Sequence, residues 1–162
     1  GLEKFLNKQN ISLYRTNVGD RYILDKMIKS KSKLGGEPSG HILLSDFAKT
    51  GDGLLTAIKV LSLLKKSGMK ASDFLRPFKL VPQSLKNLKY INKEVLSNET
   101  VTKLVNKKQK LLGNNGRILL RASGTEDLIR IMVEAENKDQ VAEITKDIAD
   151  KIIEQNDILK NK

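Results

Sequence analysis

The sequence predicts a chain of the α/β and α+β classes that is divided into two parts. Three observations lead to this prediction. Apolar residues recur at helical spacing from Leu54 to Leu64. Two apolar runs with strand character, 118–120 and 129–133, flank a short polar loop and can pair as a hairpin. Between these regions, Pro77 and Pro82 interrupt regular structure. We therefore expect a boundary at about residues 77–82.

In the first part, residues 2–6 have helical spacing and residues 11–16 have the pattern of a short strand. Asp20 is a plausible N-cap for one helix, and Asp52 is a plausible N-cap for a longer helix that ends at Gly68. The apolar side chains of these two helices are Ile23, Leu24, Met27 and Ile28 in the first and Leu54, Ala57, Ile58, Leu61 and Leu64 in the second.

In the second part, residues 84–91 can form a strand, and Ser97 or Asn98 can cap the helix that follows. Residues 113–116 read as a turn before the hairpin. After the hairpin, Asn137 is a plausible cap for a last helix. The inward side chains of this helix are expected to be Val141, Ile144, Ile148 and Ile152.

Composition limits the classes of partner and site. The formal net charge of +11 on 162 residues attracts polyanions such as phosphorylated metabolites, nucleic acid or acidic membrane surfaces. Cysteine is absent, which excludes disulfides and thiolate chemistry, and the single histidine, His41, excludes a multi-histidine metal site. No apolar run approaches the roughly 20 residues of a membrane span. We expect a soluble, cytoplasmic chain and, because it opens on Gly1 without methionine, a piece of a longer protein.

The loop between the two hairpin strands has the composition of an anion site. It places two hydroxyl residues, Ser123 and Thr125, and Gly124 between Arg121 and Arg130. A tight glycine-containing loop can turn backbone N–H groups toward one point, and an arginine fork fits phosphate oxygens. The alternative is an ordinary Ser/Gly/Thr hairpin loop without a ligand. Glu126 and Asp127 would repel a phosphate unless one of them clamps an arginine.

A second loop, residues 34–41, combines three glycines and a proline with three polar residues at alternate positions. Glu37, Ser39 and His41 can together accept and donate hydrogen bonds to the hydroxyls of a polyol or sugar. Pro38 favours an extended Glu37 that projects from the backbone. An ordinary glycine-rich turn with a partly buried histidine is the alternative.

Four motifs in order resemble the C-terminal part of the α-D-phosphohexomutases, and among them most closely the bacterial phosphoglucosamine mutase family. They are residues 16–22 (TNVGDRY), 35–41 (GGEPSGH), 50–55 (TGDGLL) and 121–126 (RASGTE). The resemblance implies an N-terminally incomplete third, sugar-binding domain of mixed sheet and helices at residues 1–76. It further implies a hinge at 77–82 and, at 83–162, a C-terminal phosphate-binding domain of antiparallel sheet packed with two helices.

The resemblance also assigns roles to residues. The sugar hydroxyls would be held by Glu37, Ser39 and His41. The phosphate that is not being transferred would be gripped by Arg121, Ser123, Gly124 and Thr125, with Arg130 beside them. Asp20 and Arg21 would support the site. The reaction implied is phosphoryl transfer between a phosphoserine of the enzyme and the sugar, through a bisphosphate intermediate.

The resemblance places the remaining chemistry outside this chain. The phosphoserine and the Mg2+ loop of three aspartates belong to the first two domains of the family, and this chain has neither motif. A hexose 1,6-bisphosphate would serve as primer. The partners implied are the phosphosugar, the N-terminal domains of the parent enzyme and a second parent subunit in a homodimer. We therefore expect the chain alone to have no mutase activity, no catalytic residue and no metal ligand.

Two positions depart from the family pattern. Pro38 stands where the glucosamine phosphate mutases usually have glutamine, and Asp127 stands where they usually have proline. Pro38 removes a backbone donor from the sugar loop, and Asp127 adds negative charge beside the phosphate loop, so either change can alter affinity.

Three alternatives remain open from the sequence. The parent can prefer glucose or mannose phosphate, because those mutases share the same loop chemistry. The chain can be a noncatalytic part that only associates with other subunits. It can also be a basic nucleic-acid-binding module, although its lysine-rich helix has no interleaved aromatic residues. The lysines of that helix are Lys103, Lys107, Lys108 and Lys110.

Overall fold

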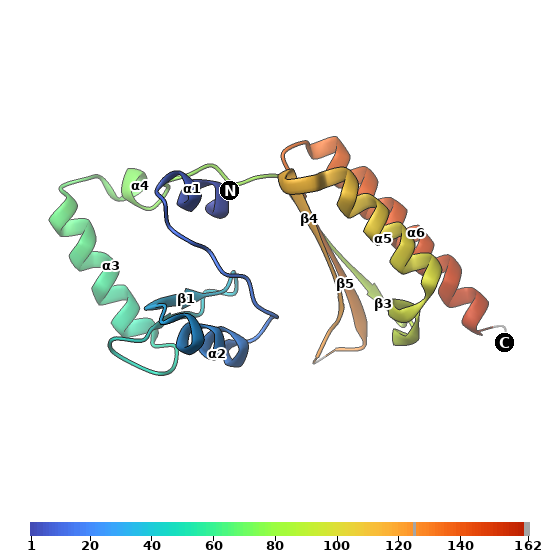
Figure 1. Cartoon of the computed structure of the whole chain (residues 1–162), viewed down its shortest axis with the longest axis horizontal. Helices are drawn as coiled ribbons and strands as arrows, with labels where there is room; N and C mark the ends of the chain where they lie inside the picture. Colours follow the sequence, from blue (N-terminus) through green and yellow to red (C-terminus); the bar gives the residue numbers. More distant parts are fainter. Residues whose placement is uncertain (125, 161–162) are drawn as a thin grey trace. The chain divides into compact units, whose positions relative to one another are not determined.

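The computed structural model describes residues 1–124 and 126–160, and its helices and strands are drawn in Figure 1. Backbone contacts divide the chain into two compact units, Gly1–Lys79 and Leu80–Lys162. Both units contain helices and an antiparallel sheet, so the predicted mixture of α/β and α+β structure is confirmed. In the described part, no helix has both the length and the apolar character needed to cross a membrane.

The first unit is centred on helix α2 (Asp20–Ser30) and a two-stranded antiparallel sheet of β1 (Leu34–Gly36) and β2 (Ile42–Leu44). Gly35 lets the helix approach the sheet, because a Cβ there would lie 2.5 Å from Cγ2 of Ile23. The buried apolar cluster consists of Ile23, Met27 and Leu43. This core is small for a unit of that length.

Helix α3 (Gly53–Ser67) has the predicted ends but not a buried face. Asp52 accepts a hydrogen bond from Leu55 N at 2.9 Å, and Gly68, with φ of 67°, ends the helix. None of its side chains is buried, and Leu54, Ile58 and Leu61 are 73%, 58% and 62% exposed. The two other helices of the unit are short, α1 (Leu2–Lys8) and α4 (Ala71–Phe74).

Two local predictions in this unit are wrong. Residues 11–16 form no strand, because no strand of the described part lies beside them to complete their hydrogen bonds. Asp20 does not cap α2. The cap is Gly19, whose φ of 128° suits glycine, and Asp20 is the first residue of the helix. The Asp20 carboxylate still favours the helix because it lies at the positive end of the helix dipole.

The second unit is an antiparallel sheet covered on one face by two helices. Strands β3 (Gln83–Lys89), β4 (Gly116–Ala122) and β5 (Leu128–Ala135) have the order β3-β5-β4. Helices α5 (Glu99–Leu112) and α6 (Lys138–Lys160) run side by side along the sheet (Figure 1). Two 3-10 turns, η1 (Lys93–Ser97) and η2 (Gly113–Asn115), flank α5.

The core of this unit follows from strand alternation. Ile129, Ile131 and Val133 on β5 point to the helices and are fully buried, together with Ile144 and Ile148 of α6. The intervening residues of β5 therefore face away from the helices. The central strand is thus fixed by apolar packing on one face, and its other face is free to present polar side chains.

Both helix starts in this unit agree with the sequence prediction. Asn98 accepts hydrogen bonds from Thr100 N at 2.8 Å and from Val101 N at 3.4 Å. Asn137 accepts from the backbone N–H groups of Asp139 and Gln140 at 2.8 and 3.0 Å. Each asparagine satisfies N–H groups that a helix leaves without an intrahelical partner.

Lys108 links α5 to α6 and gives a pH-dependent prediction. Its Nζ lies 2.5 Å from Asp147 and 3.3 Å from Glu143, and its side chain is 13% exposed. The hydrogen bond to Asp147 raises the pKa of Lys108 above its ordinary value of 10.5. We expect Lys108→Met to lower the free energy of unfolding by about 1 kcal/mol. The exposed Lys107→Met is the matched control.

A raised pKa fixes the direction of the pH effect. The stabilisation by Lys108 is fully present below its unfolded-state pKa and is lost as pH rises through the higher folded-state pKa. The wild-type and Lys108→Met chains should therefore differ by a constant amount from pH 7 to 9 in urea unfolding followed by circular dichroism. The difference should shrink above 10.5. A difference that grew with pH would contradict this assignment.

Candidate functional site

The β4–β5 hairpin places two arginines directly opposite each other. In its register Arg121 pairs with Arg130, one step before the loop that joins the strands. Like charges at directly opposed positions of an antiparallel pair repel. The hairpin therefore carries an electrostatic cost at the point where the sequence predicts an anion site.

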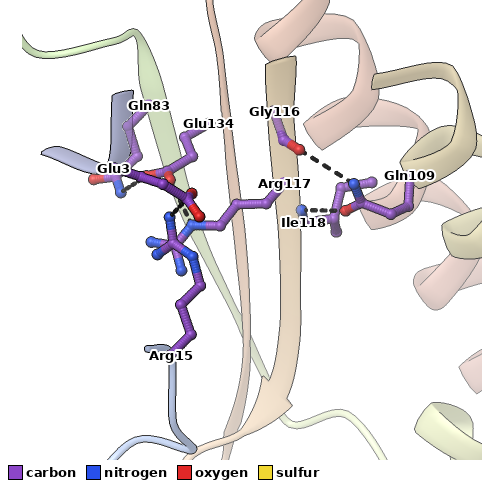
Figure 2. Close-up of polar contacts among 8 residues, drawn as sticks. All are labelled: Glu3, Arg15, Gln83, Gln109, Gly116, Arg117, Ile118 and Glu134. Carbon is purple, nitrogen blue, oxygen red and sulfur yellow. Dashed lines mark hydrogen bonds and ion pairs between the residues drawn. The ribbon is translucent and has the colours of Figure 1, made fainter. Parts of the chain in front are cut away.

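Contacts at the other end of the hairpin hold the register, as Figure 2 shows. The Gln109 side chain donates to Gly116 O at 3.2 Å and accepts from Ile118 N at 2.9 Å, which ties α5 to the start of β4. Arg117 forms an ion pair with Glu134, its partner in the register of β4 and β5. These contacts fix the alignment that brings Arg121 opposite Arg130.

The sheet face away from α5 and α6 is arranged in three rows across β3, β5 and β4. The row nearest the loop is Asn87, Arg130 and Arg121. The next row is Leu85, Met132 and Leu119, and the third is Gln83, Glu134 and Arg117. Asn87 is a polar neighbour of Arg130 that the sequence analysis did not identify. Its position depends on β3 pairing with the distant strand β5, which no local pattern reveals.

One nitrogen of the Arg130 guanidinium group has a hydrogen-bond partner among the described residues and another has none. Its Nη2 donates to Glu126 Oε2 at 2.8 Å. Its Nε is buried and has no hydrogen-bond partner among residues 1–124 and 126–160. Arg121 donates from Nη1 to Ala122 O at 3.5 Å, a long contact. Among the described residues, Glu126 pairs with Arg130 and no carboxylate pairs with Arg121, so the charge of the two guanidinium groups is only partly offset.

The loop itself is closed by its own hydrogen bonds. Ser123 is buried, its N–H donates to Leu128 O at 2.9 Å, and its Oγ accepts from Glu126 N at 3.3 Å. Gly124 is exposed, and Thr125 lies outside the described residues. Asp127 lies 3.6 Å from Lys93 Nζ, so a lysine partly offsets its added negative charge.

The predicted sugar residues lie on a tight turn between β1 and β2. Gly40 N donates to Glu37 O, and Glu37 N donates to His41 O, both at 3.0 Å. Pro38 therefore stands at the second turn position, where no N–H is needed and its fixed φ is favourable. The Ser39 hydroxyl and His41 Nδ1 lie 2.9 Å apart. His41 is exposed, so the alternative of a partly buried histidine is not observed.

The structure brings the predicted residues together in two separate groups. Glu37, Ser39 and His41 share one turn of the first unit, whereas Arg121, Ser123, Gly124 and Arg130 share one loop of the second. Asp20 and Arg21 are exposed in the first turn of α2. In the described part, no three side chains of aspartate, glutamate or histidine gather where they could hold a metal ion. The residues described therefore do not fit a Mg2+ site.

Family models cover nearly the whole chain. Residues 1–81 match the model described as phosphoglucomutase/phosphomannomutase, alpha/beta/alpha domain III. Residues 83–151 match the model described as phosphoglucomutase/phosphomannomutase, C-terminal domain. Phosphoglucosamine mutase of Bartonella bacilliformis is 46% identical over 148 residues, which are 91% of this chain and 33% of that protein. The chain thus spans about a third of the length of the curated relatives it matches.

Solved structures have the same fold at low sequence identity. Aspergillus fumigatus N-acetylphosphoglucosamine mutase in complex with glucose 1,6-bisphosphate matches with a TM-score of 0.78 at 17% identity, over 94% of this chain and 36% of that one. The same enzyme in complex with GlcNAc-6P and magnesium matches with a TM-score of 0.75 at 16% identity, over 93% and 38%. At these identities the likeness extends to the fold alone.

Because Arg121 and Arg130 repel each other, removing the positive charge of Arg121 should stabilise the folded chain. We expect Arg121→Gln to raise the free energy of unfolding by about 0.2–1 kcal/mol without ligand, because it removes the repulsion with Arg130. Arg117→Gln, on the same strand and face, should lower it by a similar amount because it breaks the pair with Glu134. Urea unfolding at low ionic strength measures both changes. If Arg121→Gln destabilises as much as Arg117→Gln, the repulsion is not significant.

Proposed function

The chain belongs to the phosphoglucomutase/phosphomannomutase family, and on that premise we propose that it is the substrate-binding C-terminal part of a phosphosugar mutase. The parent enzyme interconverts glucosamine 6-phosphate and glucosamine 1-phosphate through a phosphoserine enzyme and a bisphosphate intermediate. The observation that carries the proposal is the direct opposition of Arg121 and Arg130 beneath the Ser123–Gly124 loop. A bound phosphate would offset this repulsion, because its negative charge attracts both guanidinium groups.

The chemistry of the loop suits a phosphate that is held rather than transferred. Two guanidinium groups can each donate to phosphate oxygens in a fixed geometry. The Ser123 hydroxyl accepts from Glu126 N, so its own proton remains available for a ligand oxygen. Gly124 adds an exposed backbone amide, and Thr125 completes the proposed contacts. Holding one phosphate in this way orients the other end of the sugar toward the reacting groups.

The turn between β1 and β2 would select the sugar. Glu37 supplies a carboxylate acceptor, and the hydrogen-bonded Ser39 and His41 supply groups that can both donate and accept. Glucosamine, glucose and mannose phosphates differ in the groups that such a turn would contact. The high identity to phosphoglucosamine mutases favours glucosamine phosphate. Asp20 and Arg21 on α2 are proposed as supporting residues.

The rest of the reaction is assigned to polypeptide outside this chain. The phosphoserine, the Mg2+ ligands and the site for the hexose 1,6-bisphosphate primer would lie in the N-terminal domains of the parent enzyme, which we place in the cytoplasm. The exposed apolar face of α3, with Leu54, Ile58 and Leu61, is a surface that additional polypeptide of the parent can cover. A nucleic-acid module is less well supported, because Lys103 and Lys108 are engaged in ion pairs.

The proposal predicts two separate responses in a heteronuclear NMR titration of the chain. Inorganic phosphate and glucosamine 6-phosphate should both shift the amides of Ser123 and Gly124, whereas only the sugar phosphate should shift those of residues 37–41. Arg121→Ala should weaken binding of both ligands by about tenfold or more, as expected for loss of a hydrogen bond to a charged group. The measured quantity is the dissociation constant from the amide shifts.

Lys103→Ala is the matched control, since it removes one positive charge from an exposed position on α5 and should leave both dissociation constants nearly unchanged. Absence of shifts at both loops at millimolar ligand would contradict the assignment. So would equal losses of affinity in Arg121→Ala and Lys103→Ala, because binding would then follow the net charge alone.

The assignment of the phosphoryl-transfer residues to polypeptide outside this chain gives a prediction about turnover. The pure chain should not convert glucosamine 6-phosphate in the presence of Mg2+ and a hexose 1,6-bisphosphate, because the residues proposed to transfer the phosphoryl group are outside it. A coupled assay for glucosamine 1-phosphate measures this. Turnover above the rate without protein would contradict the assignment of these 162 residues to substrate binding only.

A further inference from the structure

Glu126 holds two of the residues that are proposed to bind the phosphate. Its carboxylate accepts from Arg130 Nη2 at 2.8 Å, and its backbone N–H donates to Ser123 Oγ at 3.3 Å. One residue of the loop therefore engages both an arginine and the serine hydroxyl.

The geometry of Arg130 means that Glu126 and a bound phosphate would compete for the same nitrogen atoms. Its Nε is buried, so a ligand from solvent can reach the guanidinium group only through the two terminal nitrogens. Glu126 already takes a hydrogen bond from one of these, Nη2. A phosphate that binds Arg130 through both terminal nitrogens must therefore displace the carboxylate of Glu126 or share Nη2 with it.

The carboxylate of Glu126 partly offsets the positive charge that the two arginines bring to the loop. Arg121 and Arg130 are opposed in the hairpin. Among the described residues, Glu126 is the carboxylate that forms an ion pair with one of these two arginines, Arg130. The neighbouring Asp127 lies instead 3.6 Å from Lys93. Glu126 thus supplies in part the negative charge that a phosphate would supply in full.

We infer that Glu126 is an internal competitor for the phosphate site: it pairs with Arg130 in the free chain and yields this arginine when the phosphate of a sugar phosphate binds. The inference rests on the proposed phosphate-binding function of the loop. Its consequence is weaker and more readily reversible phosphate binding, because the ion pair of Glu126 with Arg130 must break when the phosphate binds. Such reversibility suits a bisphosphate that must turn around between two transfers.

The test compares Glu126→Gln with wild type in an NMR titration with inorganic phosphate at constant pH and ionic strength. Glutamine keeps the length and the backbone N–H of the residue but removes the charge that competes for Arg130. We expect phosphate to bind Glu126→Gln about two- to fivefold more tightly, the range that corresponds to one exposed ion pair. Amide shifts of Ser123 and Gly124 give the dissociation constants, and an unchanged spectrum elsewhere verifies the fold.

Asp127→Asn is the matched control, since it removes the same charge from the adjacent position but leaves the pair of Glu126 with Arg130 intact. It should change the dissociation constant much less than Glu126→Gln. An equal gain in both variants would mean that only the net charge of the loop matters, and this would overturn the inference.

The remaining outcomes separate the inference from the proposed function. Unchanged or weaker binding by Glu126→Gln, with wild type binding normally, would overturn competition and indicate that Glu126 positions Arg130 for the ligand. The phosphate-binding function would stand. Absence of shifts at Ser123 and Gly124 in wild type and in both variants would overturn the proposed function and the inference together.

Discussion

The register that places Arg121 directly opposite Arg130 is the constraint on which the proposed site of the second unit depends. The strands can hold two like charges opposite each other only because other contacts fix their alignment. Burial of Ile129, Ile131 and Val133 against the helices prevents a one-residue slip, which would turn these side chains away from the core. Gln109 and the pair of Arg117 with Glu134 secure the opposite end of the hairpin. Apolar packing on one face of the sheet thus supports a polar site on the other.

The two units differ in how much of their apolar surface they bury. The second unit encloses a continuous core between its sheet and two helices. The first has a buried cluster of three residues, Ile23, Met27 and Leu43, and its longest helix, α3, has no buried side chain. A core of that size offsets little of the entropy lost on folding. The proposed phosphate loop therefore lies on the more strongly packed unit, and the proposed sugar turn lies on the unit with more apolar surface left to cover.

Local signals in the sequence predicted local structure well. Asp52, Asn98 and Asn137 each cap the expected helix, because capping depends on residues within one turn. The strand at residues 11–16 was wrong because a strand needs a partner that the local pattern does not specify. Asn87 was missed for the related reason that its place beside Arg130 depends on the order β3-β5-β4. The sequence raised the question of whether an acidic residue clamps an arginine, and the structure identifies that residue as Glu126.

A crystal structure of the chain with bound glucosamine 6-phosphate tests the central claim most directly. We expect the phosphate to lie within hydrogen-bond distance of the terminal nitrogens of both Arg121 and Arg130, near the Ser123 hydroxyl and the Gly124 amide, with the carboxylate of Glu126 moved away from Nη2. A phosphate bound elsewhere, with Arg130 still paired to Glu126 and Arg121 without contact to the ligand, would contradict the assignment of this hairpin as the phosphate site.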